Sequence, residues 1–511
     1  MKPWYAGCRH QPWIFGGVWL VWWRSGRVVW RAGLAVMFGL AIGQWWLYWG
    51  SMTSGFRRYS RRATLRSLVG GSLMMPAILA EMSRAGQSEV EPGRAHFRPR
   101  AKRVIFLFMT GGVSHLDAFD PKPRLVADHG QKVPRGLPGA GKFLIAPKRE
   151  FRPGGQAGTL VSDLFPRIRE CMDDICLIRS MTADHGNHFE ATLQMHTGSF
   201  SFARPSIGSW VSYGLGTDNQ NLPSFVVLAP HLPYAGGQVW GNDFLPGVHQ
   251  GVRVTPGDDP VPNLKPRQAV LSMQEMELDL LQRMNRRHLR ERGGDDAALA
   301  ARVQSFETAF GMQAEAPEAF DVTRESEATH ALYGLERGAT TGFAWQCLVA
   351  RRLAERGVRF IELIDTGASR NWDSHGDMGE HDALARNVDQ PIAGLLRDLK
   401  SRGMLDDTLV VWATEFGRTA YNDSPNHKGR EHHKEVFSCW MAGGGVKGGM
   451  VHGASDDFGL TVAQDGVHVH DFHATILHLL GFDHEKLTFR HGGRDYRLTD
   501  VHGKVVQAVL A

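Results

Sequence analysis

Cysteine is scarce in this sequence, with five residues among 511, one of them in the first fifty positions. Four cysteines spread over the rest of so long a chain do not make the dense disulfide framework of a small secreted domain. Cys171 and Cys176 are close enough in sequence to pair if their geometry allows it. No Cys-x-x-Cys pattern occurs, so a structural zinc site built from thiolates is not expected.

Charged residues are missing between positions 33 and 55, within a leader whose first fifty residues hold nine of the fifteen tryptophans. Its apolar part, residues 34–49, is close to the lower limit of the roughly 17–25 residues that span a bilayer. One interpretation is a membrane anchor. The other is that translation begins at Met52, which makes residues 1–51 a doubtful leader.

Residues 52–95 carry the pattern of an export signal followed by a linker. Arg61 and Arg62 are followed by a weakly apolar run over residues 67–82. The segment resembles a twin-arginine signal peptide, although Thr64 stands where Phe is commoner. The alternative is an amphipathic basic helix of the mature protein. The first interpretation predicts export of the folded protein by the twin-arginine machinery to the periplasm or cell envelope.

The exported part of the chain lacks a basic excess. The whole chain has a formal net charge of +5, but residues 1–86 hold eleven Lys or Arg and one Asp or Glu, a balance of +10. The remainder therefore carries −5. Nothing in this balance indicates a nucleic-acid partner.

From about Arg98 onward, short apolar runs alternate with helical patterns, and no internal repeat is visible. Candidate strands are residues 104–109, 175–178, 225–228, 358–364, 409–413 and 436–441. Candidate helices are residues 268–312 with a break at Gly293-Gly294, 341–356, 382–402, and 471–480 with Asp471 as its cap and Gly481 as its stop. Runs that are apolar on both faces are typical of buried parallel strands. The order predicts one α/β domain over residues 96–511, a doubly wound, mostly parallel sheet with helices on both faces. Residues 135–160 and 230–268 are expected to be surface insertions near the binding rim.

Polar clusters follow several of these apolar runs in the last third of the chain. They are Trp372-Asp373-Ser374-His375, Thr414-Glu415-Phe416-Gly417-Arg418, Arg430-Glu431-His432-His433 and Asp471-Phe472-His473. Carboxylates and imidazoles are the ligands and proton carriers of hydrolytic metal sites. Residues just past the carboxyl ends of parallel strands converge on one rim of the sheet. The clusters therefore indicate an active site, or the remains of one.

Further motifs join these clusters in a fixed order. They are the stretches at residues 111–123, 204–208, 350–353, 372–375, 414–419, 442–449 and 471–477. Together they resemble the bacterial family called domain of unknown function 1501, over roughly residues 60–511. That resemblance implies an alkaline phosphatase/sulfatase-like fold and export by the twin-arginine route.

Hydrolases of that superfamily hold one or two divalent metals at the strand ends, beside a Ser, Thr or formylglycine nucleophile. This sequence departs from the pattern in three places. Gly111-Gly112 replaces an early metal-binding Asp, and Phe416 replaces a metal-binding His. No Cys-x-Pro-x-Arg occurs, and the nucleophile position nine residues before Thr197 is His188. Formylglycine cannot be made at this site, so an ordinary sulfatase is not expected.

The resemblance implies candidate residues for metal binding and for catalysis. The candidate metal ligands are His115, Asp117, Asp373, His375, Glu415 and His432. The candidate catalytic residues are His188, Thr197 and Arg418, with His188 as ligand or nucleophile and Arg418 as a bidentate grip on an anionic group. Structural roles stay open for the same residues: turn or helix capping by Asp117 and Asp373, polar packing by His188, and a buried Glu415–Arg418 ion pair.

Three functions compete at this point. The first is a metal-dependent hydrolase of phosphate or sulfate esters, with zinc, manganese or calcium as the metal and an anionic small molecule or polysaccharide as substrate. The second is an inactive descendant that binds an anionic glycan or an envelope partner through the same rim. The third is an enzyme of another reaction type on this fold. The oligomeric state does not follow from the sequence.

Overall fold

The structure is a computed structural model that describes residues 95–262, 264, 271–291 and 297–511. The expected leader at residues 1–51 and nearly all of the export signal and linker lie outside the described residues. Among the described residues, no helix combines the length and the apolarity needed to cross a membrane.

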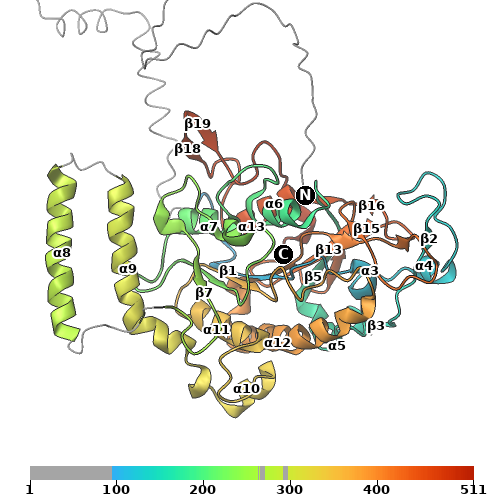
Figure 1. Cartoon of the computed structure of the whole chain (residues 1–511), viewed down its shortest axis with the longest axis horizontal. Coiled ribbons are helices and arrows are strands. Elements are labelled where there is room, and N and C mark those ends of the chain that lie inside the picture. The colour runs from blue at the N-terminus through green and yellow to red at the C-terminus, as the bar shows by residue number, and fades with distance from the viewer. Residues whose placement is uncertain (1–94, 263, 265–270, 292–296) are drawn as a thin grey trace, which may run out of the picture. The chain divides into compact units, whose positions relative to one another are not determined.

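A nine-stranded sheet forms the centre of the described chain (Figure 1). Eight strands follow one another across it, and β17 (Val467–His468) pairs beside β5. In spatial order the eight are β14 (Met450–His452), β5 (Ile175–Thr182), β13 (Phe437–Ala442), β9 (Thr408–Ala413), β1 (Arg103–Phe108), β8 (Phe360–Ile364), β6 (Phe225–Leu228) and β7 (Val252–Val254).

All strands of this sheet run in the same direction except β13, which is antiparallel to both β5 and β9. The predicted doubly wound, mostly parallel sheet is therefore confirmed. The expectation that residues 436–441 also form a parallel strand is wrong. The physical reason is that burial on both faces selects an apolar run but does not set its direction, which depends on how the preceding loop returns.

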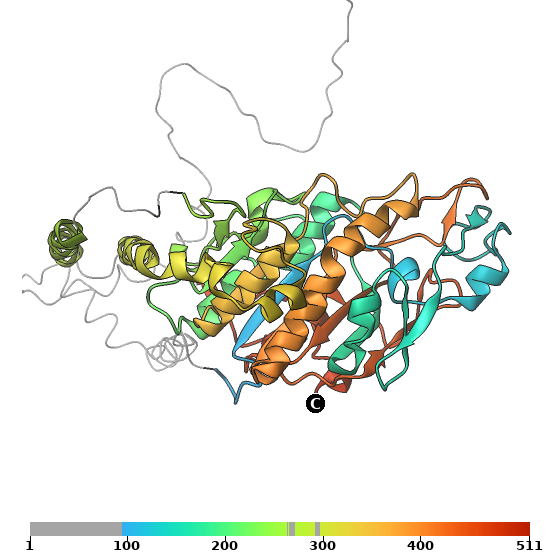
Figure 2. The same cartoon turned by 90° about the horizontal axis from the view of Figure 1, so that it is seen from below.

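Eleven helices in the described chain complete the domain. They are α3 (His115–Ala118), α4 (Pro123–Ala127), α5 (Pro166–Arg169), α6 (His188–Thr197), α7 (Ile207–Leu215), α8 (Leu271–Glu291), α9 (Ala297–Phe320), α10 (Glu327–Tyr333), α11 (Phe343–Glu355), α12 (His381–Ser401) and α13 (Val469–Leu479). Helices α6, α7 and α13 cover one face of the sheet, and α5, α11 and α12 cover the other (Figures 1 and 2).

Alternation along each strand produces two separate apolar cores. In β1, Ile105 and Leu107 join the core under α11 and α12, while Val104, Phe106 and Phe108 join the core under α7 and α13. All five side chains are fully buried. Burial of one such side chain stabilises a fold by about 1.5–3 kcal/mol. This packing holds the strand ends rigidly, and the polar clusters follow those ends.

Two helix boundaries differ from the sequence prediction. Helix α13 begins at Val469 and its cap is His468, while Asp471 stands three residues later and accepts the His468 backbone N–H at 3.1 Å. The predicted helical region at residues 268–312 is divided into α8 and α9 as expected, and its predicted break, Gly293-Gly294, lies in the undescribed stretch between them; α9, however, continues to Phe320.

Short two-stranded sheets occupy much of the remaining loops. They pair β2 (Phe143–Leu144) with β11 (Tyr421–Asn422), β3 (Phe151–Gly154) with β4 (Thr159–Ser162), β10 (Gly417–Arg418) with β12 (His432–His433), β15 (Ala454–Ser455) with β16 (Val462–Gln464), and β18 (Phe489–His491) with β19 (Arg494–Tyr496). The pair β10–β12 fixes Arg418 opposite His432.

Candidate metal centre

Five segments meet at one edge of the central sheet. Strands β1, β8 and β9 end there, and β5 ends there before the loop into α6. Because β13 runs the opposite way, the residues that precede it reach this same edge. The convergence predicted for residues past the strand ends therefore also includes His432, which stands before a strand.

His188 begins helix α6 and is 8% exposed. Its Nδ1 lies 2.9 Å from Oε1 of Glu415, which follows β9. Its Nε2 is buried without a hydrogen-bond partner, although it lies 3.2 Å from Oδ2 of Asp373. The Tyr234 ring stacks on the imidazole at 4.0 Å and holds it in place.

Asp373 is the centre of the cluster. Its Oδ1 lies 3.1 Å from Nε2 of His432 and 2.9 Å from Nε2 of His375. Those two imidazole nitrogens are themselves 3.1 Å apart. Within the described chain, His188, Asp373 and His432 form one of two groups of at least three His, Cys, Asp or Glu side chains whose ligand atoms all lie within 4.8 Å of one another.

In each imidazole, the group bonded to Nδ1 determines which ring nitrogen carries the proton and therefore which nitrogen has the free lone pair. His432 Nδ1 lies 2.9 Å from the carbonyl oxygen of Gly186, and His375 Nδ1 lies 2.8 Å from Oε2 of Glu431. Carbonyl and carboxylate oxygens only accept, so Nδ1 carries the proton in all three neutral imidazoles. Each Nε2 then turns its lone pair toward Asp373. Metal-binding histidines in proteins are oriented in this way, with the outer nitrogen donating to a carboxylate or carbonyl oxygen.

The charged groups of the cluster shift one another's pKa values. Partial burial acts to raise the pKa of Asp373, but hydrogen bonds from the protonated forms of the His188 and His432 imidazoles, together with the Arg418 guanidinium, outweigh it and hold that pKa far below its usual range. Burial acts to lower the pKa of His188, but the carboxylates of Asp373 and Glu415 outweigh it and raise the pKa. The cluster therefore attracts positive charge, either protons on the imidazoles or a divalent cation between them and Asp373.

Glu415 is fully buried and contacts His188 on the side of the ring that faces away from Asp373. Its Oε1 accepts the Gly111 backbone N–H at 2.8 Å as well as the His188 imidazole. The Thr414 hydroxyl lies 3.2 Å from its other oxygen. Phe416, in the place where the resemblance implied a histidine, packs its ring 4.9 Å from His188 and 4.5 Å from His432. Glu415 therefore orients His188, and Phe416 excludes water from the same side.

Arg418 is fully buried, and its donors are consumed within the protein. Nε donates to the Gly112 carbonyl oxygen at 2.9 Å, and the terminal nitrogens donate to the carbonyl oxygens of Gly111, Trp372 and Arg430. One terminal nitrogen also contacts Asp373 Oδ1 at 2.6 Å. The structure therefore places Arg418 as an anchor for Asp373 rather than a grip on an external anion. It also pairs Arg418 with Asp373 where the sequence left open a pair with Glu415.

His115 and Asp117 lie on α3 and do not join the cluster. His115 Nε2 lies 3.2 Å from the Gly459 carbonyl oxygen, and burial beside His433 lowers the pKa of His115 well below its ordinary value. Asp117 accepts from the Ser114 hydroxyl at 2.6 Å and pairs with Arg430 Nε at 2.8 Å. The cause is Gly111-Gly112, which turns the chain sharply after β1 and carries α3 past the rim.

Thr197 also stands apart from the cluster. It ends the helix that His188 begins, about 14 Å further along the helix axis. Its hydroxyl lies 2.8 Å from the Leu193 carbonyl oxygen and 3.0 Å from that of Ser199. A residue so placed cannot contact a group held at Asp373. Ser374 cannot take the place of Thr197 as a catalytic hydroxyl, because it is fully buried and contacts His381. The Nε2 of His381 in turn accepts the Ser114 backbone N–H at 3.3 Å.

Sequence reasoning missed three residues that complete the surroundings of the cluster. Tyr234 comes from the insertion at 230–268, and its hydroxyl accepts from Asn371 Nδ2 at 2.8 Å. Asp365 follows β8 and accepts the Thr110 backbone N–H at 3.0 Å and the Trp372 indole N–H. The only sequence signal was the position of Asp365 directly after a buried strand. No local pattern around Tyr234 pointed to a contact with His188.

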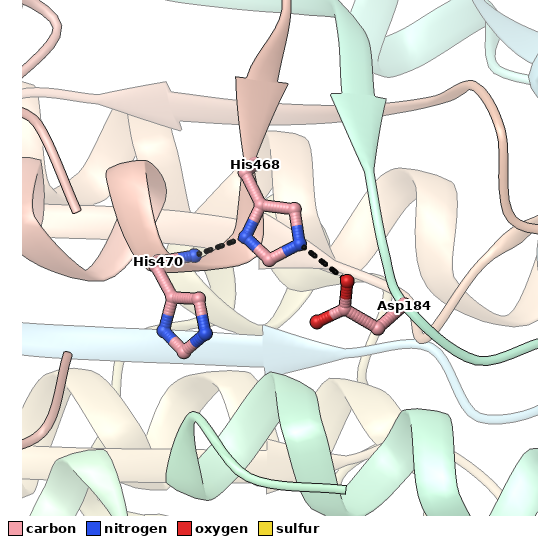
Figure 3. A group of neighbouring side chains, drawn as sticks. All are labelled: Asp184, His468 and His470. Carbon is pink, nitrogen blue, oxygen red and sulfur yellow. Dashed lines mark hydrogen bonds and ion pairs between the residues drawn. The ribbon is translucent and has the colours of Figure 1, made fainter. Parts of the chain in front are cut away.

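A second cluster, Asp184, His468 and His470, lies at the start of α13 (Figure 3). His468 Nδ1 accepts the His470 backbone N–H at 3.2 Å, so a neutral His468 carries its proton on Nε2, which faces Asp184 Oδ1 at 3.3 Å. That nitrogen has no lone pair to offer a metal. The other Asp184 oxygen accepts from the Gln194 amide. This donor set fits a hydrogen-bonded helix cap and does not fit a metal ion.

Comparison with known proteins identifies one protein family and several solved structures that the chain resembles. The family model described as Protein of unknown function (DUF1501) matches residues 101–510. No curated protein matches the sequence. Three solved structures that resemble it are lipoteichoic acid synthase LtaP from Listeria monocytogenes, PsFucS1 sulfatase from Pseudoalteromonas sp., and the alkaline phosphatase of the Antarctic bacterium TAB5.

These similarities are distant. LtaP has a TM-score of 0.36 at 8% identity, with 81% of this chain and 79% of that chain covered. PsFucS1 has a TM-score of 0.31 at 12% identity, with 79% and 71% covered. The TAB5 phosphatase has a TM-score of 0.28 at 11% identity, with 68% and 92% covered. Each TM-score is below 0.5, so these similarities assign neither an activity nor a substrate to this chain.

Proposed function

This chain belongs to the DUF1501 family, and from that premise we propose that it is a metal-dependent hydrolase of phosphate or sulfate esters that works without formylglycine. The observation that carries the proposal is the convergence of three Nε2 lone pairs on Asp373, each fixed by a bond at Nδ1. His188, His432, His375 and Asp373 would hold the metal. An imidazole-rich set of this kind favours zinc over manganese and calcium, which prefer oxygen ligands.

A divalent metal bound there would supply a Lewis acid and lower the pKa of a bound water. The chain's own residues prepare the site for it. Arg418 anchors Asp373 from within the protein, and Glu415 orients His188. Tyr234 and Phe416 cover the imidazoles and keep water from two sides of His188. The N-terminal end of α6 points at the cluster, and helix N-termini favour anionic groups.

The Tyr234 hydroxyl lies beside the proposed site. It accepts the Asn371 amide, which leaves its own proton available. Burial raises the pKa of Tyr234, so the hydroxyl stays protonated at neutral pH. We expect it to donate a hydrogen bond to an ester oxygen.

Elemental analysis of the protein purified without chelator tests the metal. We expect about one equivalent of one divalent metal, and its loss in Asp373→Asn and His432→Ala. Asp184→Asn, in the helix cap of the second cluster, is the matched control and should retain the metal. No metal in the wild-type protein after incubation with zinc, manganese and calcium would reject the site.

A screen of phosphate and sulfate monoesters with the metal-loaded protein then tests the reaction. Turnover that disappears in Asp373→Asn and persists in Asp184→Asn supports the hydrolase. Metal binding without turnover of any ester would instead favour a protein that binds an anionic glycan or envelope partner through this rim.

A further inference from the structure

Helix α8 exposes a stripe of large apolar side chains. Met273, Met276, Leu280 and Met284 are spaced three or four residues apart and are 48%, 64%, 59% and 59% exposed, with Leu281 beside them at 53%. That spacing puts the first four on one side of the helix. These residues are called the α8 stripe below. An apolar stripe of this length on a surface helix marks an interaction site.

The α8 stripe faces away from the neighbouring helix α9. The partly buried residues of α8 are Gln274, Leu278, Gln282, Asn285 and Leu289, which also recur every three or four positions. Gln274 Nε2 donates to Oε1 of Gln313 on α9 at 3.0 Å. Figures 1 and 2 both show α8 on the outer side of α9. The more polar side of α8 therefore packs on α9, and the more apolar side faces solvent.

Charge is divided between the two halves of α8. Glu275, Glu277 and Asp279 lie in its first half, and Arg283, Arg286, Arg287 and Arg290 lie in its second half; all seven are exposed. Glu291, the last residue of the helix, pairs with Arg287 at 2.8 Å, so the second half remains net basic. This order suits the dipole of a single helix. It also suits one particular partner. A second α8 in antiparallel orientation places each acidic half against a basic half, whereas a parallel orientation places like charges together.

We propose that α8 is a dimerisation helix that pairs with α8 of a second copy of this chain, antiparallel about a two-fold axis near Leu280. A two-fold axis requires each contact to be repeated on the other side. With the centre at Leu280, Leu280 meets its own copy and Met276 meets Met284, so these three central residues of the α8 stripe are self-complementary. A helix of 21 residues is about 31 Å long, which makes a small interface. We therefore expect a reversible dimer with a Kd that is roughly micromolar or weaker.

Sedimentation equilibrium of the full chain over a hundredfold concentration range tests the interface. We expect the wild-type protein to shift from monomer to dimer and Leu280→Glu to remain monomeric throughout. Val501→Glu replaces another exposed apolar residue, 71% exposed and outside α8, and should dimerise like the wild type. Circular dichroism checks that both variants keep their helices, as we expect for substitutions of exposed residues. Dimerisation unchanged in Leu280→Glu would overturn the proposal.

Charge reversal tests the antiparallel orientation. Glu277→Lys/Asp279→Lys makes α8 basic along its length, and Arg283→Glu/Arg287→Glu makes it more acidic along its length. Each variant alone should lose dimerisation, and an equimolar mixture should form a heterodimer because opposite charges again face one another. A mixture that stays monomeric would overturn the pairing. A wild-type protein that is monomeric throughout and sediments with phosphatidylglycerol vesicles would show that the α8 stripe binds a lipid surface instead.

Discussion

At the scale of single residues, the atom that accepts the hydrogen bond from Nδ1 determines whether an imidazole of the cluster can bind a metal through Nε2. Glu415 provides this atom for His188, and Glu415 is itself fixed by the Gly111 backbone N–H. A carboxylate in this position raises the basicity of the imidazole and fixes its tautomer. In the proposed site, Glu415 would therefore act on a metal through His188 without touching it.

Glu415→Gln is expected to weaken metal binding about 10- to 100-fold, because the neutral amide is a poorer acceptor for the His188 N–H. Competition with a chromogenic chelator measures this affinity. Glu362→Gln is the matched control, since Glu362 also contacts an imidazole, at Nε2 of His196 at 2.8 Å, but is buried within β8. Equal losses in the two variants would show that Glu415 contributes only to folding.

At the scale of elements, the turn between β1 and α3 determines which residues reach the rim. Gly111 and Gly112 have φ values of +117° and +82°, a region that residues with a Cβ rarely adopt. A Cβ on Gly112 would lie 2.6 Å from the Phe416 ring and 3.3 Å from Arg418 Nε. The turn therefore leaves no space for a side chain where Phe416 and Arg418 pack.

Gly112→Ala is expected to lower the free energy of unfolding by about 1–2 kcal/mol for the positive φ and by about 1–3 kcal/mol more for the clash. Gly136 has a φ of +92°, and a Cβ added there has no atom within 4 Å, so Gly136→Ala should show only the loss of stability due to the positive φ. Urea denaturation measures both variants. Equal destabilisation of the two would mean that Phe416 and Arg418 move aside freely.

At the scale of the whole molecule, buried neutral histidines make stability depend on pH. Burial lowers the pKa of His473 from 6.5 to about 3, although its hydrogen bond to the Met195 carbonyl oxygen acts to raise it. Below pH 6.5 the unfolded chain takes up a proton on this residue and the folded chain does not. The unfolded state is then favoured, so the free energy of unfolding falls as the pH drops from 6.5 toward 3.

His473→Gln is expected to remove a slope of about 1.4 kcal/mol per pH unit from the acid side of the stability curve. The amide can still donate to the Met195 carbonyl oxygen. Burial also raises the pKa of Asp365 and Asp389 to about 6, and these groups act in the opposite direction. The difference between variant and wild type, measured by urea denaturation from pH 7.5 to 4.5 with chelator present, isolates His473. Parallel curves would contradict the prediction.

The sequence by itself determined the alternation of buried strands and amphipathic helices, and with it the mostly parallel sheet. It also determined that Asp373, His375 and Glu415 lie at one rim, because residues past the ends of parallel strands share an edge. These features depend on local periodicity and on connection order, which a single chain displays directly.

Only the tertiary structure decided which polar residues meet. The reversed direction of β13 brings His432 to the rim, the turn at Gly111-Gly112 takes His115 and Asp117 away from it, and stacking by Tyr234 covers His188. The helix that carries His188 places Thr197 at its far end. The physical reason is that lone-pair directions and ring contacts depend on distances between segments far apart in the sequence, which no local pattern specifies.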